Sequence, residues 1–370
     1  MGQPDITVVH VVAADLSDAR ADALLALSAS PQVAARQEVV HVGRGASRLF
    51  EVVRPVRVHA PLGLGRLRRC ALVRTLARLG LSGVRDPIVW HAWSPSAARW
   101  CLPMTESGHR LLVEADTHPP QHCRRSVDPS ASVAYACPSA AVQAQLRACS
   151  FPAERCVLIR PSVDADAIRR DRRPLVRSQL GLTDEYVAAL VLPPITRAAG
   201  SFTVAWATLL VGHVCPRVRL VVPTGGRERD RIRRFVGACR HEHGARFVGA
   251  DLPLRDLFVA ADLALFLPPD DAATDGLAWA MAAGCPLVAA NVPSVTELLT
   301  HGRTAWLCRP GDVQDAAHWT LRAVEHPEQS RRQAEQARTE ALALFSRSQM
   351  IAEYRRTYAD LLAGRPVAQP

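Results

Sequence analysis

Short runs of β-branched and apolar residues alternate with longer stretches rich in Ala, Leu and Arg along most of this 370-residue chain. The short runs have the length and composition of buried strands, and the longer stretches have the apolar periodicity of helices. A chain that repeats this order builds βαβ units, whose strands lie parallel in a sheet with helices on its faces. The alternation therefore predicts an α/β protein with doubly wound parallel sheets.

The expected elements fall into two series. The strands are 6–14, 38–42, 51–58, 87–90, 110–113, 132–137 and 156–160, then 187–192, 217–222, 245–248, 262–267, 286–290 and 304–308. The helices are 17–27, 67–79, 139–148 (with Ser139 as N-cap), 201–211, 227–240, 254–260, 277–283, 313–325, 329–344 and 348–362. A charged stretch with a proline, 164–177, is interpreted as a connector. Two doubly wound sheets in series place a ligand in the cleft between them, at the carboxyl ends of the strands.

The charge is strongly basic, at +10, and every basic side chain other than histidine is arginine. Arginine binds phosphate bidentately, so the excess is typical of proteins that meet nucleic acid, anionic membranes or phosphorylated ligands. A GC-rich coding bias, which would also explain the abundant Ala, is the alternative. Clusters such as 227–234 (RERDRIRR) contain acids and no aromatics that could stack on bases, so nucleic acid is not favoured.

No apolar run approaches the ~18 residues of a membrane span. The first apolar run carries His10 and has no basic stretch before it, which indicates a strand and not a signal peptide. We therefore expect a cytoplasmic protein, and the amphipathic basic stretch 67–79 leaves open peripheral contact with the inner face of the membrane. The ten cysteines are scattered without a C-x-x-C pair, so we expect no metal site.

Several stretches in the second half match a known pattern in order and spacing. They are 247–249 (FVG), 257–262 (LFVAAD), 280–289 (AMAAGCPLVA), 295–298 (VTEL), 301–307 (HGRTAWL) and 309–312 (RPGD). Together they resemble the C-terminal domain of retaining GT-B glycosyltransferases, family 4 of the sugar transferases. Gly284 fits a helix end with positive φ, and Gly302 and Gly311 fit turns. The first half is similar more loosely, through 89–93 and 157–164.

The resemblance implies a GT-B fold, with two Rossmann-like domains facing a cleft. An acceptor domain would occupy 1–165, a nucleotide-sugar domain 166–347, and a helix in 348–370 would pack back toward the first domain. The implied reaction moves a sugar, with retention, from a nucleotide-sugar donor to a glycan, lipid or small-molecule acceptor, without a metal or other cofactor. Such a site must neutralise the leaving diphosphate with cations or helix N-termini, and must orient the sugar beside the acceptor.

The stretch 193–200 (PPITRAAG) aligns with a family pattern whose Arg and Lys clamp the donor phosphates. Pro194 stands at the Arg position and Ala199 at the Lys position. Arg197, two residues before the lost Lys, could supply one cation, or could be an ordinary surface arginine. Gly225, Gly226 and Arg227 follow a predicted strand where the family has a nucleotide-binding glycine turn.

The two-glutamate motif of the family aligns with Asp271 and Trp279, and an indole cannot accept a hydrogen bond from a ribose hydroxyl. Backbone N–H groups at a helix start are offered by Thr274, Asp275, Gly276 and Leu277. A shift of two residues would place Gly276 and Leu277 on the family's Gly-Leu pair, and both registers stay open. For Asp271 and Asp275, a polar loop with an N-cap is the alternative. Glu297 keeps a family position and would contact the donor or cap its own helix.

In the first half, His91 matches a family histidine and is expected to face the mouth of the cleft, or else to be a satisfied strand-end histidine. The resemblance places a catalytic His at Ala115, next to a retained Asp116, and His118 could substitute for it. No glycine occurs in 13–16, where the family has a glycine-rich turn.

Three functional hypotheses follow. The first is a glycosyltransferase. The second is a catalytically inactive GT-B protein that binds or scaffolds, because several phosphate, ribose and catalytic positions have changed. The third, a nucleic-acid binder, rests on charge alone.

Overall fold

The computed structural model describes residues 6–13, 16, 18–43, 55–58, 65–81, 88–115, 132–226, 228–249 and 252–367. The chain divides into two compact units. Unit 1 comprises Met1–Pro161 and Arg347–Pro370, and unit 2 comprises Ser162–Ser346. Each unit is a parallel sheet with helices on its faces, which confirms the predicted fold class.

Unit 1 has a seven-stranded sheet with the order β3-β2-β1-β4-β5-β6-β7, all pairs parallel. The strands are β1 (Thr7–Val12), β2 (Arg36–Val42), β3 (Val56–Val58), β4 (Val89–Ala92), β5 (Arg110–Glu114), β6 (Val133–Cys137) and β7 (Cys156–Leu158). The helices are α1 (Asp18–Ser28), α3 (Gly65–Arg78), α4 (Pro95–Thr105), α5 (Ala140–Ala148) and α14 (Arg347–Leu362).

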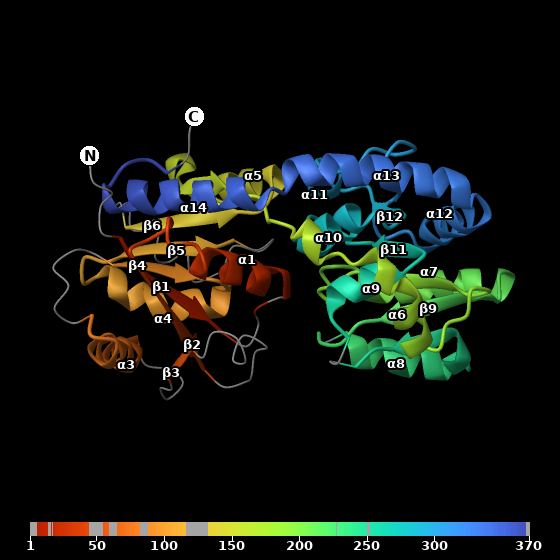
Figure 1. The fold of residues 1–370 in the computed structure, drawn as a ribbon, viewed down its shortest axis with the longest axis horizontal. Helices are drawn as coiled ribbons and strands as arrows, with labels where there is room; N and C mark the ends of the chain where they lie inside the picture. The colour runs from red at the N-terminus through yellow and green to blue at the C-terminus, as the bar shows by residue number, and fades with distance from the viewer. Residues whose placement is uncertain are drawn as a thin grey trace. The chain divides into compact units, whose positions relative to one another are not determined.

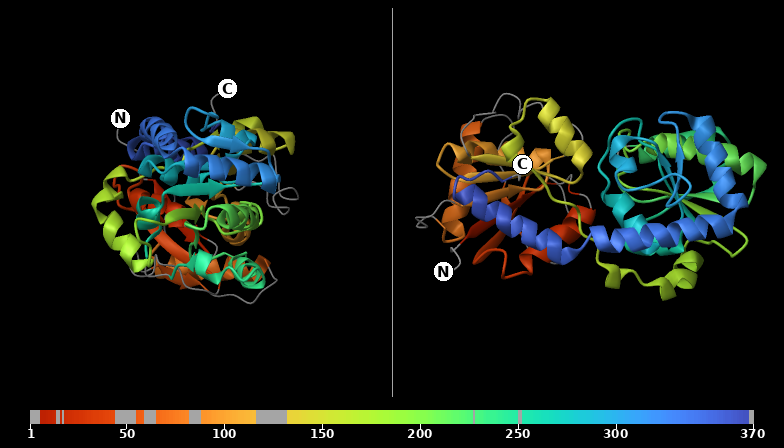
Figure 2. Two further views of the ribbon diagram at one scale, coloured as in Figure 1. Left: turned by 90° about the vertical axis from the view of Figure 1, so that its right-hand side faces the viewer. Right: turned by 90° about the horizontal axis from the view of Figure 1, so that it is seen from above.

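Strand alternation gives this sheet two separate cores. Val9, Trp90 and Leu111 point to the face covered by α3, α4 and α5. Residues one position along each strand, such as Val8 and Val89, point to the opposite face, which α1 and α14 cover. Figures 1 and 2 show the blue α14 lying beside the red α1, although they come from opposite ends of the chain.

Unit 2 has a six-stranded parallel sheet with the order β10-β9-β8-β11-β12-β13. The strands are β8 (Val187–Val191), β9 (Val218–Val222), β10 (Ala245–Phe247), β11 (Leu263–Phe266), β12 (Leu287–Ala290) and β13 (Trp306–Cys308). The helices are α6 (Arg173–Gln179), α7 (Ser201–Val214), α8 (Arg229–Ala238), α9 (Leu254–Ala260), α10 (Asp275–Ala283), α11 (Pro293–Thr296), α12 (Val313–Glu325) and α13 (Pro327–Leu344). Helices α7, α8 and α12 share one core with the sheet, while α6 packs on α9 and α10 on α13.

Each predicted strand overlaps a strand of the structure, and two local details are confirmed. The Ser139 hydroxyl accepts a hydrogen bond from the Val142 N–H at the start of α5. Gly284 ends α10 with φ of +67°. Among the described helices, α4, α6 and the short α11 were not predicted. Pro103 lies inside α4 and interrupts its helical pattern.

The interpretation of 164–177 as a connector is wrong for its second half. Arg173 and Arg177 lie in α6 and both bind Asp262, which precedes β11. Arg177 is buried, and its guanidinium also donates to the Thr183, Tyr186 and Ala260 carbonyls. A buried arginine requires such partners, and composition alone does not reveal them.

Within the described residues, no helix combines the length and the apolar character needed to cross a bilayer.

Candidate functional site

The candidate site of unit 2 lies at the carboxyl ends of β8 and β11. The strand order reverses between these two neighbours, since β9 and β10 continue on one side and β12 and β13 on the other. Open α/β sheets bind ligands in the crevice outside such a switch point. The loop 192–200 follows β8, and the loop 267–274 follows β11.

The loop 192–200 is held by short-range hydrogen bonds. The Thr196 N–H donates to the Ser201 hydroxyl at 3.1 Å, and the Ala199 N–H donates to the Thr196 hydroxyl at 3.2 Å. Gly200 then begins α7 with φ of +68°. A Cβ on Gly200 would lie 1.6 Å from the Leu267 carbonyl oxygen. Only glycine therefore lets this loop touch the end of β11.

Two further glycines bring other segments against the same loop. A Cβ on Gly226, which has φ of +80°, would lie 2.1 Å from the Ile195 carbonyl oxygen. A Cβ on Gly276, in the first turn of α10, would lie 2.5 Å from the Pro193 carbonyl oxygen. The turn after β9 and the start of α10 thus meet on the loop after β8. Of the two predicted turn glycines, Gly225 also has positive φ, at +84°.

The start of α10 offers backbone donors. Thr274 is the N-cap residue, and its side chain makes no capping hydrogen bond. The first N–H groups of a helix have no acceptor within the helix, and the helix dipole favours an anion beside them. Asp275, Gly276 and Leu277 form this first turn and are buried, as is Thr274. The segment 274–277, which was predicted to offer backbone N–H groups to a ligand, is therefore the N-terminus of α10 and follows the loop after β11.

Arg197 is exposed in the loop 192–200, and its guanidinium makes no hydrogen bond or ion pair within the part of the chain that the structure describes. Arg229, at the start of α8, already has hydrogen-bond partners, because its guanidinium donates to the Pro223 and Val248 carbonyls. Arg227 lies outside the described residues. A ligand at this edge would thus find a free cation in Arg197.

Asp271 fixes the neighbouring helix. Its carboxylate accepts from the Ser294 N–H at 2.7 Å in the first turn of α11, and the Ser294 hydroxyl accepts from the Ala272 N–H at 3.2 Å. This pair of bonds corresponds to the capping alternative, although the helix that it caps is α11 and not α10. Glu297 is the half-buried C-cap residue of α11. Trp279 is 4% exposed inside α10, so its indole is a core side chain.

The comparisons with known proteins cover this site. Residues 197–326 match the family described as glycosyl transferases group 1. The matched segment lies within unit 2 and spans about a third of the chain. The match includes Arg197, the turn after β9 and both α10 and α11. It confirms the family resemblance seen in the sequence.

A curated relative and several solved structures agree with this assignment. N-acetyl-alpha-D-glucosaminyl L-malate synthase of Bacillus anthracis is 27% identical over 144 residues, which span 39% of this chain but only 38% of that protein. The complex of Anabaena HepE with UDP and glucose has a TM-score of 0.78 at 19% identity, covering 94% of this chain and 98% of that one. Sucrose-phosphate synthase of Thermosynechococcus elongatus has a TM-score of 0.76 at 17% identity, covering 97% and 99%. These likenesses show that the chain has the GT-B fold.

Outside the matched segment, unit 1 carries polar side chains inside its core. His91 is 0% exposed. Its Nε2 lies 2.9 Å from a Glu114 carboxylate oxygen, and its Nδ1 lies 2.7 Å from the Tyr358 hydroxyl. The Tyr354 hydroxyl donates to the same Glu114 oxygen at 2.7 Å. The expectation that His91 faces a cleft is corrected, because its strand position points to the face that α14 covers.

The charge states within this network follow from burial. Burial lowers the pKa of His91 despite its hydrogen bond to Glu114, so the ring is neutral at pH 7. The His91 bond, the charge of Arg20 and the Tyr354 bond together hold the pKa of Glu114 below its usual range, against the effect of burial. A neutral His91 that donates from Nε2 to an ionised Glu114 accepts from the Tyr358 hydroxyl at Nδ1.

A second buried group lies on the adjoining strand. His10 pairs with His91 in the β1–β4 register. The Trp93 indole N–H donates to His10 Nδ1 at 3.1 Å, and His10 Nε2 lies 3.1 Å from the Gln37 amide oxygen. Burial, together with the neighbouring His91, lowers the pKa of His10 to about 3. The Arg20 guanidinium donates to the Trp93 and Ala115 carbonyls beside this cluster.

The sequence reasoning did not predict this network. Two signals were available: a glutamate at the end of an apolar strand, and tyrosines four residues apart on the last helix, which therefore share a face. Neither signal identifies the partner. Asp116 and His118 lie outside the described residues, as do residues 14 and 15 of the stretch 13–16.

No group of three or more His, Cys, Asp or Glu side chains that could hold a metal ion occurs among the described residues.

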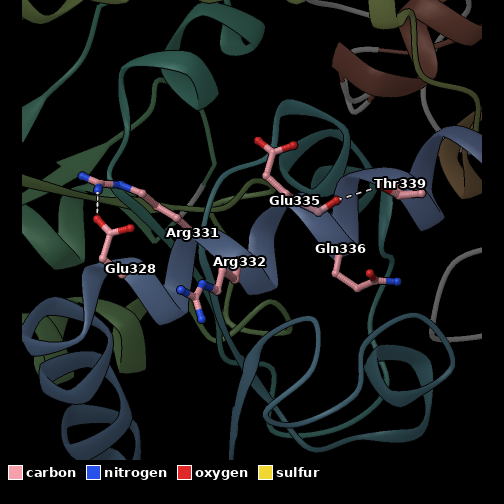
Figure 3. Close-up of a pocket in the computed structure, with 6 residues that line it drawn as sticks. All are labelled: Glu328, Arg331, Arg332, Glu335, Gln336 and Thr339. Carbon is pink, nitrogen blue, oxygen red and sulfur yellow. Dashed lines mark hydrogen bonds and ion pairs between the residues drawn. The ribbon is translucent and has the colours of Figure 1, made fainter.

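Unit 2 also has a surface hollow on α13, away from the candidate site. It is lined by Glu328, Arg331, Arg332, Glu335, Gln336 and Thr339 of α13 (Figure 3). Glu335 pairs with Arg170, which donates to the Ala283 carbonyl at the last residue of α10. A nine-residue helix is ~13 Å long, so the hollow belongs to the opposite end of α10 from the candidate site.

Proposed function

We propose that this protein transfers a sugar, with retention, from a nucleoside diphosphate sugar held by unit 2 to a glycan, lipid or small-molecule acceptor. The observation that carries the proposal is the meeting of three segments on the loop after β8, at positions where any Cβ would collide. These contacts build a continuous backbone surface at the switch point, inside the matched family segment. The HepE structures contain UDP or UDP-glucose, which supports a uridine donor.

In this proposal each part of the site meets one need of the chemistry. The N–H groups of Thr274, Asp275, Gly276 and Leu277 and the cation of Arg197 neutralise the leaving diphosphate. Gly225 and Gly226, with Arg227, receive the nucleotide. The donor phosphate itself helps to take the proton of the acceptor hydroxyl, so no separate base and no metal is needed.

The remaining predicted residues take supporting roles. Asp271 positions the loop before α10 by tying it to α11, and Glu297 at the end of α11 contacts the donor. Unit 1 receives the acceptor. His91 positions β5 through Glu114 rather than touching the substrate, and Asp116 follows the end of β5.

A second candidate function is an inactive GT-B protein that binds or scaffolds. It is favoured by Pro194 and Ala199, which stand where the resemblance places two phosphate cations. Charge-assisted hydrogen bonds of this kind contribute about 1.5–3 kcal/mol each. One arginine, Arg197, replaces them within the described loop.

Donor binding separates these candidates in two steps. A ligand present at a hundred times its Kd stabilises the folded protein by about 2.7 kcal/mol. We therefore expect UDP or a UDP-sugar to raise the Tm. The shift should fall in Arg197→Ala but not in the matched control Arg322→Ala, an exposed arginine on α12. No shift with UDP, GDP or their sugars would exclude a donor-using enzyme.

The second step measures slow hydrolysis of the bound donor as release of UDP. Release that depends on Arg197 supports the transferase. Binding with no release, also in the presence of candidate acceptors, supports the inactive binder. An equal Tm shift in Arg197→Ala and the wild type would contradict the proposed phosphate site.

A further inference from the structure

Helix α7 presents an apolar stripe to solvent. Trp206 is 46% exposed, Leu210 38% and Val214 70%, and four-residue spacing places them along one side of the helix. Its sequence, SFTVAWATLLVGHV, contains no Asp, Glu or Arg. The opposite side of α7 packs on β8, β9 and α12. A helix that is apolar on every side is normally enclosed, yet no element among the described residues covers this side of α7.

The neighbouring helix α8 extends this stripe into a patch. The rings of Phe202 and Phe235 are half-buried, with centroids 4.9 Å apart across α7 and α8. The Trp206 ring lies 6.3 Å from Phe235. We call these three side chains, together with Leu210 and Val214, the α7–α8 patch. Figure 1 shows the two helices in the green to teal part of unit 2.

The border of the α7–α8 patch is basic. The Arg231 guanidinium lies 4.0 Å above the Phe202 ring. Arg233, Arg234 and Arg240 are exposed along the same segment. Residues 201–226 contain no Asp or Glu. The acids of α8 and its N-cap are Asp230 and Glu228, and the latter is largely covered and paired with Arg231.

We propose that the α7–α8 patch docks on a lipid bilayer that contains anionic headgroups. Tryptophan prefers the boundary between headgroups and acyl chains, and aliphatic side chains such as Leu210 and Val214 enter the apolar layer just beneath it. Arginines at the border then meet the anionic headgroups. This combination is the one that interfacial helices use.

A second copy of the chain fits the patch less well. A two-fold interface brings the same surface against itself, so the arginines on α8 would face arginines. Like charges across an interface are unfavourable, whereas the same arginines are complementary to an acidic bilayer. The charge of the border therefore selects the lipid surface over self-association.

The first experiment asks whether Trp206 enters the bilayer. The chain has seven tryptophans, and Trp206 is the one classed as exposed, since Trp90, Trp93, Trp100, Trp279 and Trp306 are buried and Trp319 is half-buried. Vesicles of phosphatidylcholine with phosphatidylglycerol, with part of the phosphatidylcholine brominated in its acyl chains, should quench the fluorescence of Trp206. We expect quenching in the wild type and its loss in Trp206→Phe, which keeps an aromatic ring on the patch.

The second experiment compares variants by vesicle flotation. The triple variant Trp206→Ser, Leu210→Ser, Val214→Ser should lose binding to anionic vesicles by about tenfold or more. Arg231→Gln with Arg234→Gln should weaken binding and reduce its dependence on salt. Two controls, Leu175→Ser and Arg331→Gln with Arg332→Gln, alter exposed leucine and arginines elsewhere in unit 2 and should bind like the wild type.

Three outcomes would overturn the proposal. The wild type does not float with anionic vesicles, or the triple variant floats as well as the controls. Alternatively, the wild type forms dimers in analytical ultracentrifugation that the triple variant abolishes, which would assign the patch to a second copy. Unchanged near-ultraviolet circular dichroism confirms that each variant is folded. None of these readouts uses a sugar donor, so they stand apart from the proposed transferase activity.

Discussion

The two units share one architecture but place their polar chemistry differently. In unit 1, the polar groups lie within the strands and are enclosed beneath α1 and α14. In unit 2, the candidate polar groups lie beyond the strand ends, on loops held together where glycine replaces a side chain. The integrity of unit 1 therefore depends on hydrogen-bonded side chains and their protonation, and that of the candidate site in unit 2 depends on missing Cβ atoms.

The largest effect is expected from His91→Leu. The substitution removes the hydrogen bond that the neutral His91 ring donates to the buried, ionised Glu114, and leaving a buried charged group without such a donor costs about 3 kcal/mol or more. Urea denaturation should show this loss in the free energy of unfolding. A loss below about 1 kcal/mol would mean that Glu114 does not rely on His91. The double variant His91→Leu, Glu114→Leu should recover part of the loss, since no unpaired charge remains.

Gly200→Ala tests whether the candidate site of unit 2 depends on the absence of a Cβ atom. A left-handed conformation costs a residue with a Cβ about 1–2 kcal/mol, and the clash with Leu267 adds to this, so we expect a loss of about 3 kcal/mol. Gly225→Ala is the matched control, because its φ is also positive but its Cβ would meet nothing within 4 Å. Calorimetry should show a clearly smaller loss for the control. Equal losses would mean that the contact with Leu267 is unimportant.

Acidification should destabilise unit 1 through His10. The folded state keeps His10 neutral, with a pKa of about 3, whereas the unfolded chain binds a proton near pH 6.5. The unfolded state thus holds more protons below pH 6.5, and stability falls by about 1.4 kcal/mol per pH unit. Between pH 6.5 and 5 the loss is about 2 kcal/mol. The variant His10→Gln should show a flatter dependence, and an unchanged slope would contradict this assignment.

The smallest effect is expected from Tyr358→Phe. It removes one hydroxyl that donates to His91 Nδ1, and a single neutral hydrogen bond contributes about 1 kcal/mol. Tyr354→Phe should cost more, because its partner is the ionised Glu114. Chemical denaturation of both variants checks this order. The reverse order would indicate that Glu114 is not the charged member.

The sequence predicts local features better than distant partners. Periodicity places the strands, and Gly284 marks the end of α10, because those signals lie within a few residues of each other. Tyr354 bonds to a residue 240 positions away and Tyr358 to one 267 positions away, so no local sequence pattern predicts these hydrogen bonds. The same limit applies to the arginines of α6, whose partner Asp262 is far along the chain. In the candidate site, glycines were recognised as turn residues, but the carbonyls they approach became visible only in the structure.

The position of α14 in unit 1 has a consequence for synthesis on the ribosome. Unit 2 is one continuous segment, whereas unit 1 lacks the helix that covers Glu114 until α14 has been made. At about 5–20 residues per second, the 240 residues that separate Glu114 from Tyr354 take roughly 10–50 s to translate. During that interval the nascent unit 1 leaves uncovered the part of its sheet on which α14 packs. Unit 2 can therefore reach its native state before the domain that precedes it.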